Sequence, residues 1–154
     1  MSTLNALSVA VEVALRKRDE ARRLLQDAQG AHQAAQDQLH QLQGYARETE
    51  GRWGMRANAA VQPEVMFHHY QFMDRLGHAV GLQTTVVGDH GSRVQGATRA
   101  LLEAELRLAS LRKVVEKRQQ DHARQQMRLE QKQTDERASM QVRNAINGPP
   151  GQEY

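Results

Sequence analysis

Cysteine is absent from this 154-residue chain, and proline, aromatic residues and long apolar runs are scarce. The lack of cysteine excludes disulfides and thiolate metal ligands, and it is typical of a reducing compartment. Because aromatic residues make up only 4% of the chain and hydrophobic residues 39%, a large compact core is not expected. No apolar run reaches the roughly eighteen residues that a membrane-spanning helix needs.

The first twenty residues, MSTLNALSVAVEVALRKRDE, place their charges after the apolar part. A secretory signal has the opposite order, with positive charge first. We therefore expect a cytoplasmic protein with no integral membrane segment.

Alanine, leucine, glutamine, glutamate and arginine dominate the composition, as they do in long helices and coiled coils. The net charge is +3 and the pI about 9.6, but acidic and basic residues are interspersed. Such a mixture is typical of a solvated helix surface.

The stretch 66–115 carries a seam of residues at alternating intervals of three and four. This spacing predicts a helix that packs along another helix as a coiled coil. A stripe this narrow does not form a globular core alone, so a second helix is required. The seam consists of Met66, His69, Met73, Leu76, Val80, Gln83, Val87, His90, Val94, Ala97, Leu101, Ala104, Leu108, Leu111 and Val115.

A matching seam occupies residues 4–46. Its members are Leu4, Leu7, Val11, Ala14, Arg18, Ala21, Leu25, Ala28, His32, Ala35, Leu39, Leu42 and Ala46. The two seams predict an all-α fold, with two long helices in an antiparallel coiled-coil hairpin and the second helix longer and overhanging. We expect a single domain over residues 1–147: a helix over about 3–50, a connector over about 51–62, a helix over about 63–144, and a disordered tail at 148–154.

The connector is predicted from two glycines, an asparagine and Pro63, which suits the first turn of a new helix. If the chain folds back near residue 57, Leu4 lies opposite about residue 110. The apolar seam ends at Val115, so about thirty residues of the second helix should overhang, and a polar single helix of that length is marginal without a partner. The glycines of GDHGS at 88–92 predict a kink, a break or a hinge.

Nothing in the sequence indicates catalysis or a cofactor. Walker, GxSxG and HExxH motifs are absent, and a two-helix hairpin has no pocket that excludes water. The adjacent His68 and His69 point to different faces of a helix and make a poor pair of metal ligands. We therefore do not expect an enzyme.

Five of the six aromatic residues lie between residues 45 and 72. We expect Phe67 and Tyr70 to cap the closed end of the hairpin. Phe72 precedes the seam residue Met73, so it should lie beside the seam, partly in water. Three- and four-residue steps define two short ridges, which predict either an interaction surface or simple packing. One ridge is Gln38, Leu42 and Tyr45, and the other is Phe72, Leu76 and Ala79.

Basic side chains that could contact phosphates are concentrated in two stretches. These are RKRDEARR at 16–23 and the segment 117–143. Their interspersed acids favour a solvated mixed-charge surface or an acidic protein partner instead. A nucleic-acid-binding coiled coil thus stays open as an alternative.

Two stretches, PEVMFHHYQFMDRLGHAV at 63–80 and RLEQKQTDERASMQ at 128–141, make the chain resemble the FliJ family of the bacterial flagellar type III export apparatus. The resemblance covers essentially the whole chain. It implies a stalk-like antiparallel coiled coil that inserts its terminal end into the hexameric export ATPase FliI. It also implies binding to the cytoplasmic domain of the export gate protein FlhA, handling of export chaperones, no binding of nucleic acid, and peripheral association with the inner-membrane apparatus. Stalk proteins of virulence-type secretion share this architecture.

The resemblance also implies two sets of site residues. The gate-binding surface would be formed by Gln38, Leu42, Tyr45, Phe72, Leu76 and Ala79. The residues expected to contact the ATPase ring are Arg16, Arg18, Arg22, Arg124, Arg128, Lys132 and Arg137.

Overall fold

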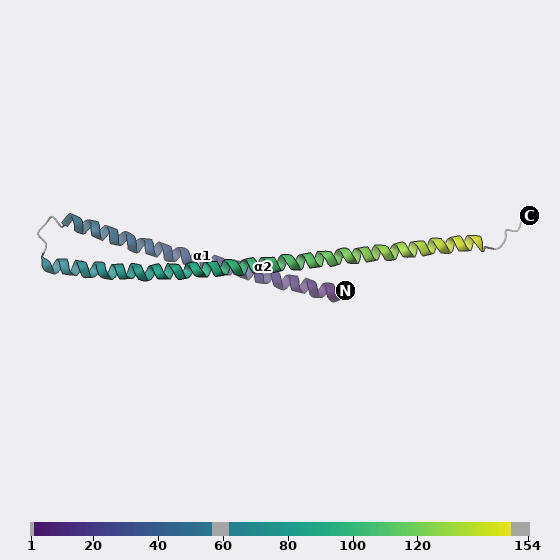
Figure 1. Ribbon diagram of the computed structural model, residues 1–154, viewed down its shortest axis with the longest axis horizontal. Helices are drawn as coiled ribbons and strands as arrows, with labels where there is room; N and C mark the ends of the chain where they lie inside the picture. Colours follow the sequence, from purple (N-terminus) through teal and green to yellow (C-terminus); the bar gives the residue numbers. More distant parts are fainter. Residues whose placement is uncertain (1, 57–61, 149–154) are drawn as a thin grey trace, which may run out of the picture. The chain divides into compact units, whose positions relative to one another are not determined.

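The computed structural model describes residues 2–56 and 62–148, which form two α-helices, α1 (Ser2–Arg56) and α2 (Pro63–Ile146) (Figure 1). These described residues contain no strand, and the predicted all-α antiparallel coiled-coil hairpin is confirmed. Contacts divide the chain into two units. We call Val13–Arg107 the hairpin unit, and Met1–Glu12 with Leu108–Tyr154 the terminal unit.

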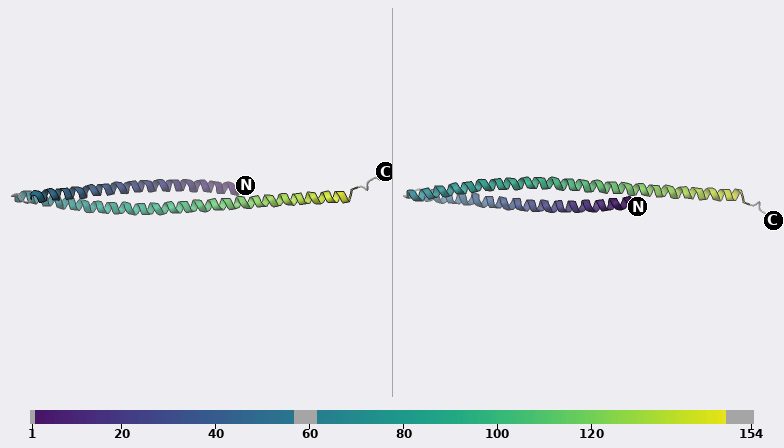
Figure 2. Two further views of the ribbon diagram at one scale, coloured as in Figure 1. Left: turned by 90° about the horizontal axis from the view of Figure 1, so that it is seen from above. Right: turned by 90° about the horizontal axis from the view of Figure 1, so that it is seen from below.

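In the hairpin unit, α1 and α2 run side by side in opposite directions (Figures 1 and 2). The predicted seam residues of this unit are buried or half-buried, with Met66 as the exposed exception. Ala14 is 2% exposed and Leu76 is 8% exposed. The seam therefore provides the unit with its core, in which leucine contributes most of the burial energy, at roughly 1.5–3 kcal/mol per buried side chain.

Alanine recurs every seventh residue along the α1 seam, at Ala14, Ala21, Ala28 and Ala35. Small side chains at these positions let α2 approach closely. Gln83 uses this space, because its Nε2 donates a hydrogen bond to the backbone oxygen of Ala35 at 3.0 Å. This bond defines the register of the two helices.

The first helix continues past its predicted end near residue 50, through Gly51 and Gly54 to Arg56. Trp53 explains the difference, because its ring stacks on that of His69 with centroids 4.0 Å apart and planes 6° apart. An ion pair of 2.6 Å between Arg52 and Glu48 adds support along α1. Packing at Trp53 therefore outweighs the low helix propensity of the two glycines, which is roughly 1 kcal/mol each relative to alanine. The rest of the predicted connector, 57–61, lies outside the described residues.

The second helix is uninterrupted across residues 88–92, so the predicted break is absent there, and the hinge stays a prediction. Among the described residues, no glycine has a positive φ. Glycine lowers helix stability without forbidding helical geometry, so a helix whose face packs against a partner can include Gly88 and Gly91.

In the terminal unit, residues near the beginning of α1 pack beside α2. Leu108 is buried, and Leu7, Val11 and Leu111 are half-buried. A hollow of about 410 Å³ is lined by Thr3 and Leu4 together with Arg118, Asp121, His122 and Gln125. Leu4 thus lies beside residues about two to four turns further along α2 than the predicted position near 110. The prediction was wrong because it assumed a fold-back near residue 57 and a shorter first helix.

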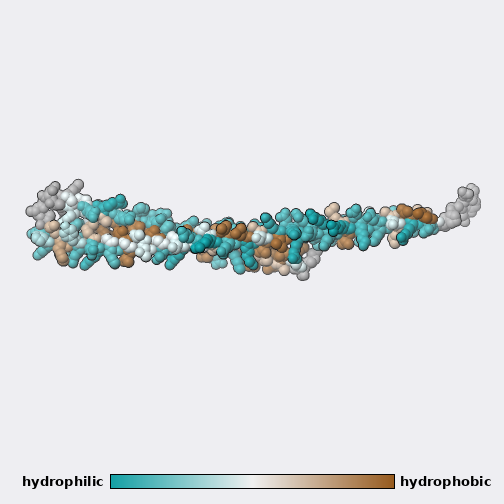
Figure 3. All heavy atoms as spheres, viewed as in Figure 1, coloured by the Kyte–Doolittle hydropathy of each residue, from teal (hydrophilic) through white to brown (hydrophobic). Residues whose placement is uncertain are grey.

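Every described residue from 116 to 148 is exposed. Figure 2 shows α2 continuing past the beginning of α1, and Figure 3 shows that this end has a mainly hydrophilic surface. An overhang is therefore present, but it begins beyond Gln125 and not directly after Val115 as predicted, because Thr3 and Leu4 lie beside residues 118–125. The predicted tail lies almost wholly outside the described residues. Over the part of the chain that the structure describes, neither helix is long and apolar enough to cross a membrane.

Candidate interaction surface on the hairpin unit

Tyr45 of α1 and Phe72 of α2 meet beside the seam. Their ring centroids lie 6.0 Å apart at 83°, an edge-to-face arrangement. Each ring remains partly in water, with Tyr45 52% exposed and Phe72 41% exposed. The two ridges predicted from the sequence thus form one surface, built from both helices.

We call this surface the aromatic ridge. It consists of Gln38, Leu42, Tyr45, Phe72, Leu76 and Ala79. Its members differ in exposure: Gln38, Tyr45 and Phe72 are exposed, Leu42 and Ala79 are half-buried, and Leu76 is buried. Leu76 belongs to the seam, so it packs beneath the ridge between the two helices. A partner would contact the exposed residues Gln38, Tyr45 and Phe72.

A hollow of about 350 Å³ extends the aromatic ridge toward the end of α1. Its lining residues are Thr49, Arg52, Trp53, Val65, His68, His69 and Phe72. The sequence analysis missed this hollow, although a signal was available. Trp53 follows Ala46 by seven residues and Val65 precedes Phe72 by seven, so both continue established heptad positions.

Phe67 and Tyr70 do not cap the hairpin as predicted, because they are 60% and 61% exposed. Their positions fall off the seam, and the stacked pair of Trp53 and His69 fills the space between the helices instead. Phe67 therefore provides a natural comparison for Phe72, because both are exposed phenylalanines of α2 and Phe72 belongs to the ridge, where its ring meets that of Tyr45 of α1.

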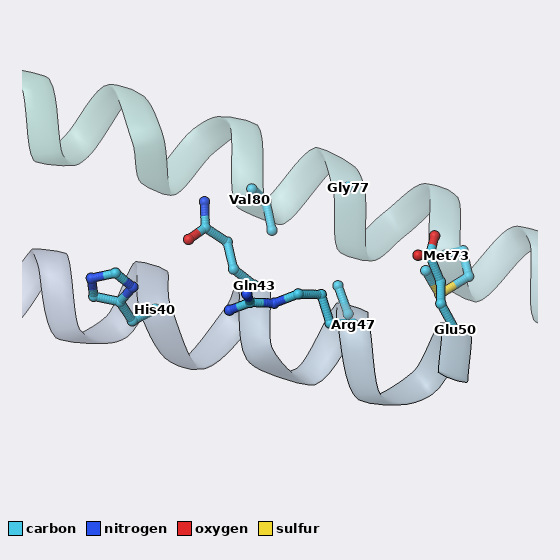
Figure 4. A pocket seen from close by; sticks show the side chains of 8 residues that line it. His40, Gln43, Arg47, Glu50, Met73, Gly77 and Val80 are labelled. Atoms are coloured by element: carbon cyan, nitrogen blue, oxygen red, sulfur yellow. The ribbon is translucent and has the colours of Figure 1, made fainter. Parts of the chain in front are cut away.

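A groove of about 670 Å³ lies on the other flank of the seam, where Gly77 has no side chain (Figure 4). Its lining residues are His40, Gln43, Ala46, Arg47, Glu50, Met73, Gly77 and Val80. The side chains of Gln43, Arg47 and Glu50 come from α1, and those of Met73 and Val80 come from α2 (Figure 4). The rim carries charges of both signs, so the groove does not select a partner of one charge.

The basic residues assigned to the ATPase ring have different surroundings. Arg18 occupies a seam position, and its side chain is 21% exposed. Its Nε and one terminal nitrogen donate to the Asp19 carboxylate at 3.0 and 2.9 Å. Arg22 approaches Glu105 across the helices at 3.9 Å. Arg18 is thus engaged within the hairpin unit, whereas Arg16 and Arg22 are its exposed candidates.

The remaining four, Arg124, Arg128, Lys132 and Arg137, are exposed on α2 in the terminal unit. Arg124, Arg128 and Lys132 follow one another at intervals of four residues, so they form a stripe along one face of α2, whereas Arg137 lies on a different face. Among the described residues, no cluster of three or more His, Asp or Glu side chains is placed to hold a metal ion.

Two long antiparallel helices that pack through heptad seams define a coiled-coil protein. The sequence profile of the flagellar FliJ protein matches residues 3–147. The chain belongs to the FliJ family and is thus a non-enzymatic, stalk-like component of type III secretion.

A solved structure with a similar fold is that of a putative YscO homolog from Chlamydia trachomatis. The TM-score is 0.71 and the sequence identity 16%, with 97% of this chain and 96% of that chain covered. At this identity the similarity concerns the fold alone. A comparison with curated protein sequences gave no match.

Proposed function

We propose that this protein couples the export ATPase of a flagellar type III apparatus to its export gate. The end of α2 enters the hexameric ring of FliI, and the aromatic ridge binds the cytoplasmic domain of FlhA. In this role the protein works in the cytoplasm at the inner-membrane apparatus and assists export chaperones. Membership of the FliJ family supports the setting.

The observation that carries the proposal is the uninterrupted exposure of α2 from residue 116 to its end at Ile146. A polar helix of this length is only marginally stable without a partner. Basic and acidic side chains are interspersed along this helix. It can therefore contact a ring at several positions through charged groups, instead of through one tightly packed apolar contact. Ordering on binding to the ring would stabilise the helix.

The ATPase arm of the proposal is tested by reversing charge at Arg124 and Arg128. Arg124→Glu with Arg128→Glu should reduce stimulation of FliI activity, because both side chains are exposed and free to meet a ring. Reversal at Arg75, exposed in the hairpin unit, is the matched control and should leave stimulation unchanged. Equal effects of the two changes would count against a specific contact at the end of α2.

The gate arm is tested by comparing the two phenylalanines. Phe72→Ala should weaken binding of the FlhA cytoplasmic domain by about tenfold or more, because aromatic anchors at interface centres often contribute about 2 kcal/mol. Phe67→Ala, which changes a more exposed phenylalanine off the ridge, should leave the affinity unchanged. Isothermal titration calorimetry measures both, and circular dichroism verifies the helix content. Leu76 is a poor probe here, because its burial mixes packing with binding.

Equal affinity of the Phe72→Ala variant and the unaltered protein would remove the aromatic ridge from the gate contact. The ATPase arm would be unaffected by that result, because it depends on the other unit of the chain.

A further inference from the structure

The seam in the middle of the hairpin unit differs from the seam on either side. We define the middle segment as residues 28–35 of α1 with residues 83–91 of α2, which the bond from Gln83 to Ala35 places together. Its seam residues are Ala28, His32, Ala35, Gln83, Val87 and His90. Val87 is the one large aliphatic residue among them. This segment therefore gains less from apolar burial than its neighbours, at roughly 1.5–3 kcal/mol for each large side chain that is missing.

The neighbouring segments have aliphatic seams. Toward the end of α1, Leu39 and Leu42 pack at the level of Leu76 and Val80. In the other direction, the seam includes the large residues Leu25, Val94 and Leu101, interspersed with Arg18, Ala21 and Ala97. The weakly packed stretch is thus bounded on both sides by better-packed coiled coil.

The backbone of α2 is also weak in the middle segment. It contains Gly88 and Gly91, and each glycine lowers helix stability by about 1 kcal/mol relative to alanine. Neither position requires glycine. Nothing lies within 4 Å of a β-carbon built at Gly88, and at Gly91 the nearest atom is Nε2 of His32 at an ordinary contact distance of 3.6 Å.

Hydroxyl side chains bond to the helix backbone in and next to this segment, as Thr98 also does to Val94 at 2.8 Å in the neighbouring one. Thr84 donates to the backbone oxygen of Val80 at 2.8 Å, and Ser92 donates to that of Gly88 at 3.2 Å. Thr85 makes the same type of bond to Gly81 at 3.3 Å. Bonds from a hydroxyl to the carbonyl four residues earlier slightly destabilise helices and often bend them.

One polar contact holds this segment in register. The bond from Gln83 Nε2 to the Ala35 oxygen is the one side-chain hydrogen bond that joins α1 to α2 in the described part of the chain. A bond of this kind is worth only about 1 kcal/mol. It is directional, so it selects the register of the closed state without holding the helices firmly together.

We propose that the middle segment is a soft joint built into the hairpin. It opens locally, with the helices separating and α2 losing part of its helical hydrogen bonding, while the flanking segments stay closed. Such sub-global opening is expected where apolar contacts are few and the backbone is weak. The joint lets the segment that carries the aromatic ridge shift against the rest of the hairpin unit without unfolding either. This inference does not depend on which partners the protein binds.

Hydrogen–deuterium exchange on the full chain tests the joint directly. Amides of residues 83–91 should show protection about tenfold or more below that of residues 73–80 and 94–104. Equal or higher protection in the middle segment would overturn the proposal.

Alanine substitution provides the matched test. Gly88→Ala with Gly91→Ala should raise the protection of residues 83–91 by about tenfold or more, because two helix-weakening positions are removed without a clash. Gly96→Ala is the control, since it makes the same change just outside the segment, where nothing lies within 4 Å of the new β-carbon. It should leave residues 83–91 unchanged. If the control raises their protection as much as the double variant does, opening is global and the soft joint is rejected.

Discussion

The two parts of α2 maintain their helix by different means. As far as Val115, a seam residue of α2 meets α1 at almost every step, and the helix is stabilised by burial. From residue 116 onward no side chain is buried, and the apolar residues Met127, Leu129 and Met140 all face solvent. The comparison shows that the spacing of apolar residues, more than their number, decides whether a helix gains stability from a partner.

The largest expected effect contrasts one leucine from each part. Leu76→Ala should lower the free energy of unfolding by about 2–4 kcal/mol, because it leaves a cavity in the seam. Leu129→Ala removes the same atoms from an exposed position and should change the free energy by less than about 0.5 kcal/mol. Urea denaturation followed by circular dichroism measures both. Similar losses would show that the end of α2 packs against something in solution.

A smaller effect is expected at the inter-helix hydrogen bond. Gln83→Ala removes the donor to Ala35 and should cost about 1 kcal/mol. Gln95→Ala, on the exposed side of the same helix, is the control and should be close to neutral. An equal effect at both positions would mean that helix propensity, and not the bond, accounts for the loss.

Removing the end of α2 should have little effect on stability. A chain ending at Gln125 keeps the hollow beside Leu4 but loses the exposed helix beyond it. Its unfolding midpoint should shift by no more than about 2 °C, because little apolar area is lost. Differential scanning calorimetry gives the midpoint, and a decrease of ten degrees or more would contradict an unpaired end.

The smallest effect is expected at the ion pair of Arg22 and Glu105. The atoms are 3.9 Å apart and both side chains are about half exposed, so a double-mutant cycle with alanine should give a coupling energy below about 0.5 kcal/mol. A coupling above about 1 kcal/mol would show that charge pairs contribute to holding the helices together.

Heptad spacing was sufficient to predict the seams, because burial on a helix depends on position along it and the periodicity is visible in one sequence. It also predicted the polar end of α2, where the seam stops after Val115. The predicted end of α1 near residue 50 was wrong, because the low helix propensity of Gly51 and Gly54 was expected to end the helix there. A ring stack between residues from different helices, Trp53 and His69, overrides that preference.

The candidate site was only partly predictable. Spacing placed Tyr45 and Phe72 beside their seams, but their contact depends on the register between the helices. That register is tied to one bond, from Gln83 to Ala35, which no local pattern indicates. The sequence placed Leu76 both in the seam and in the ridge, and its side chain is buried, as the seam predicted.

Trp53 is the single tryptophan of the chain, and its indole lies flat on the imidazole of His69 from the other helix. Indole emission is sensitive to such a neighbour and to water. The protein therefore carries an intrinsic fluorescent reporter of helix separation at this point. Its signal would register the arrival of a ligand at the adjoining hollow without any added dye.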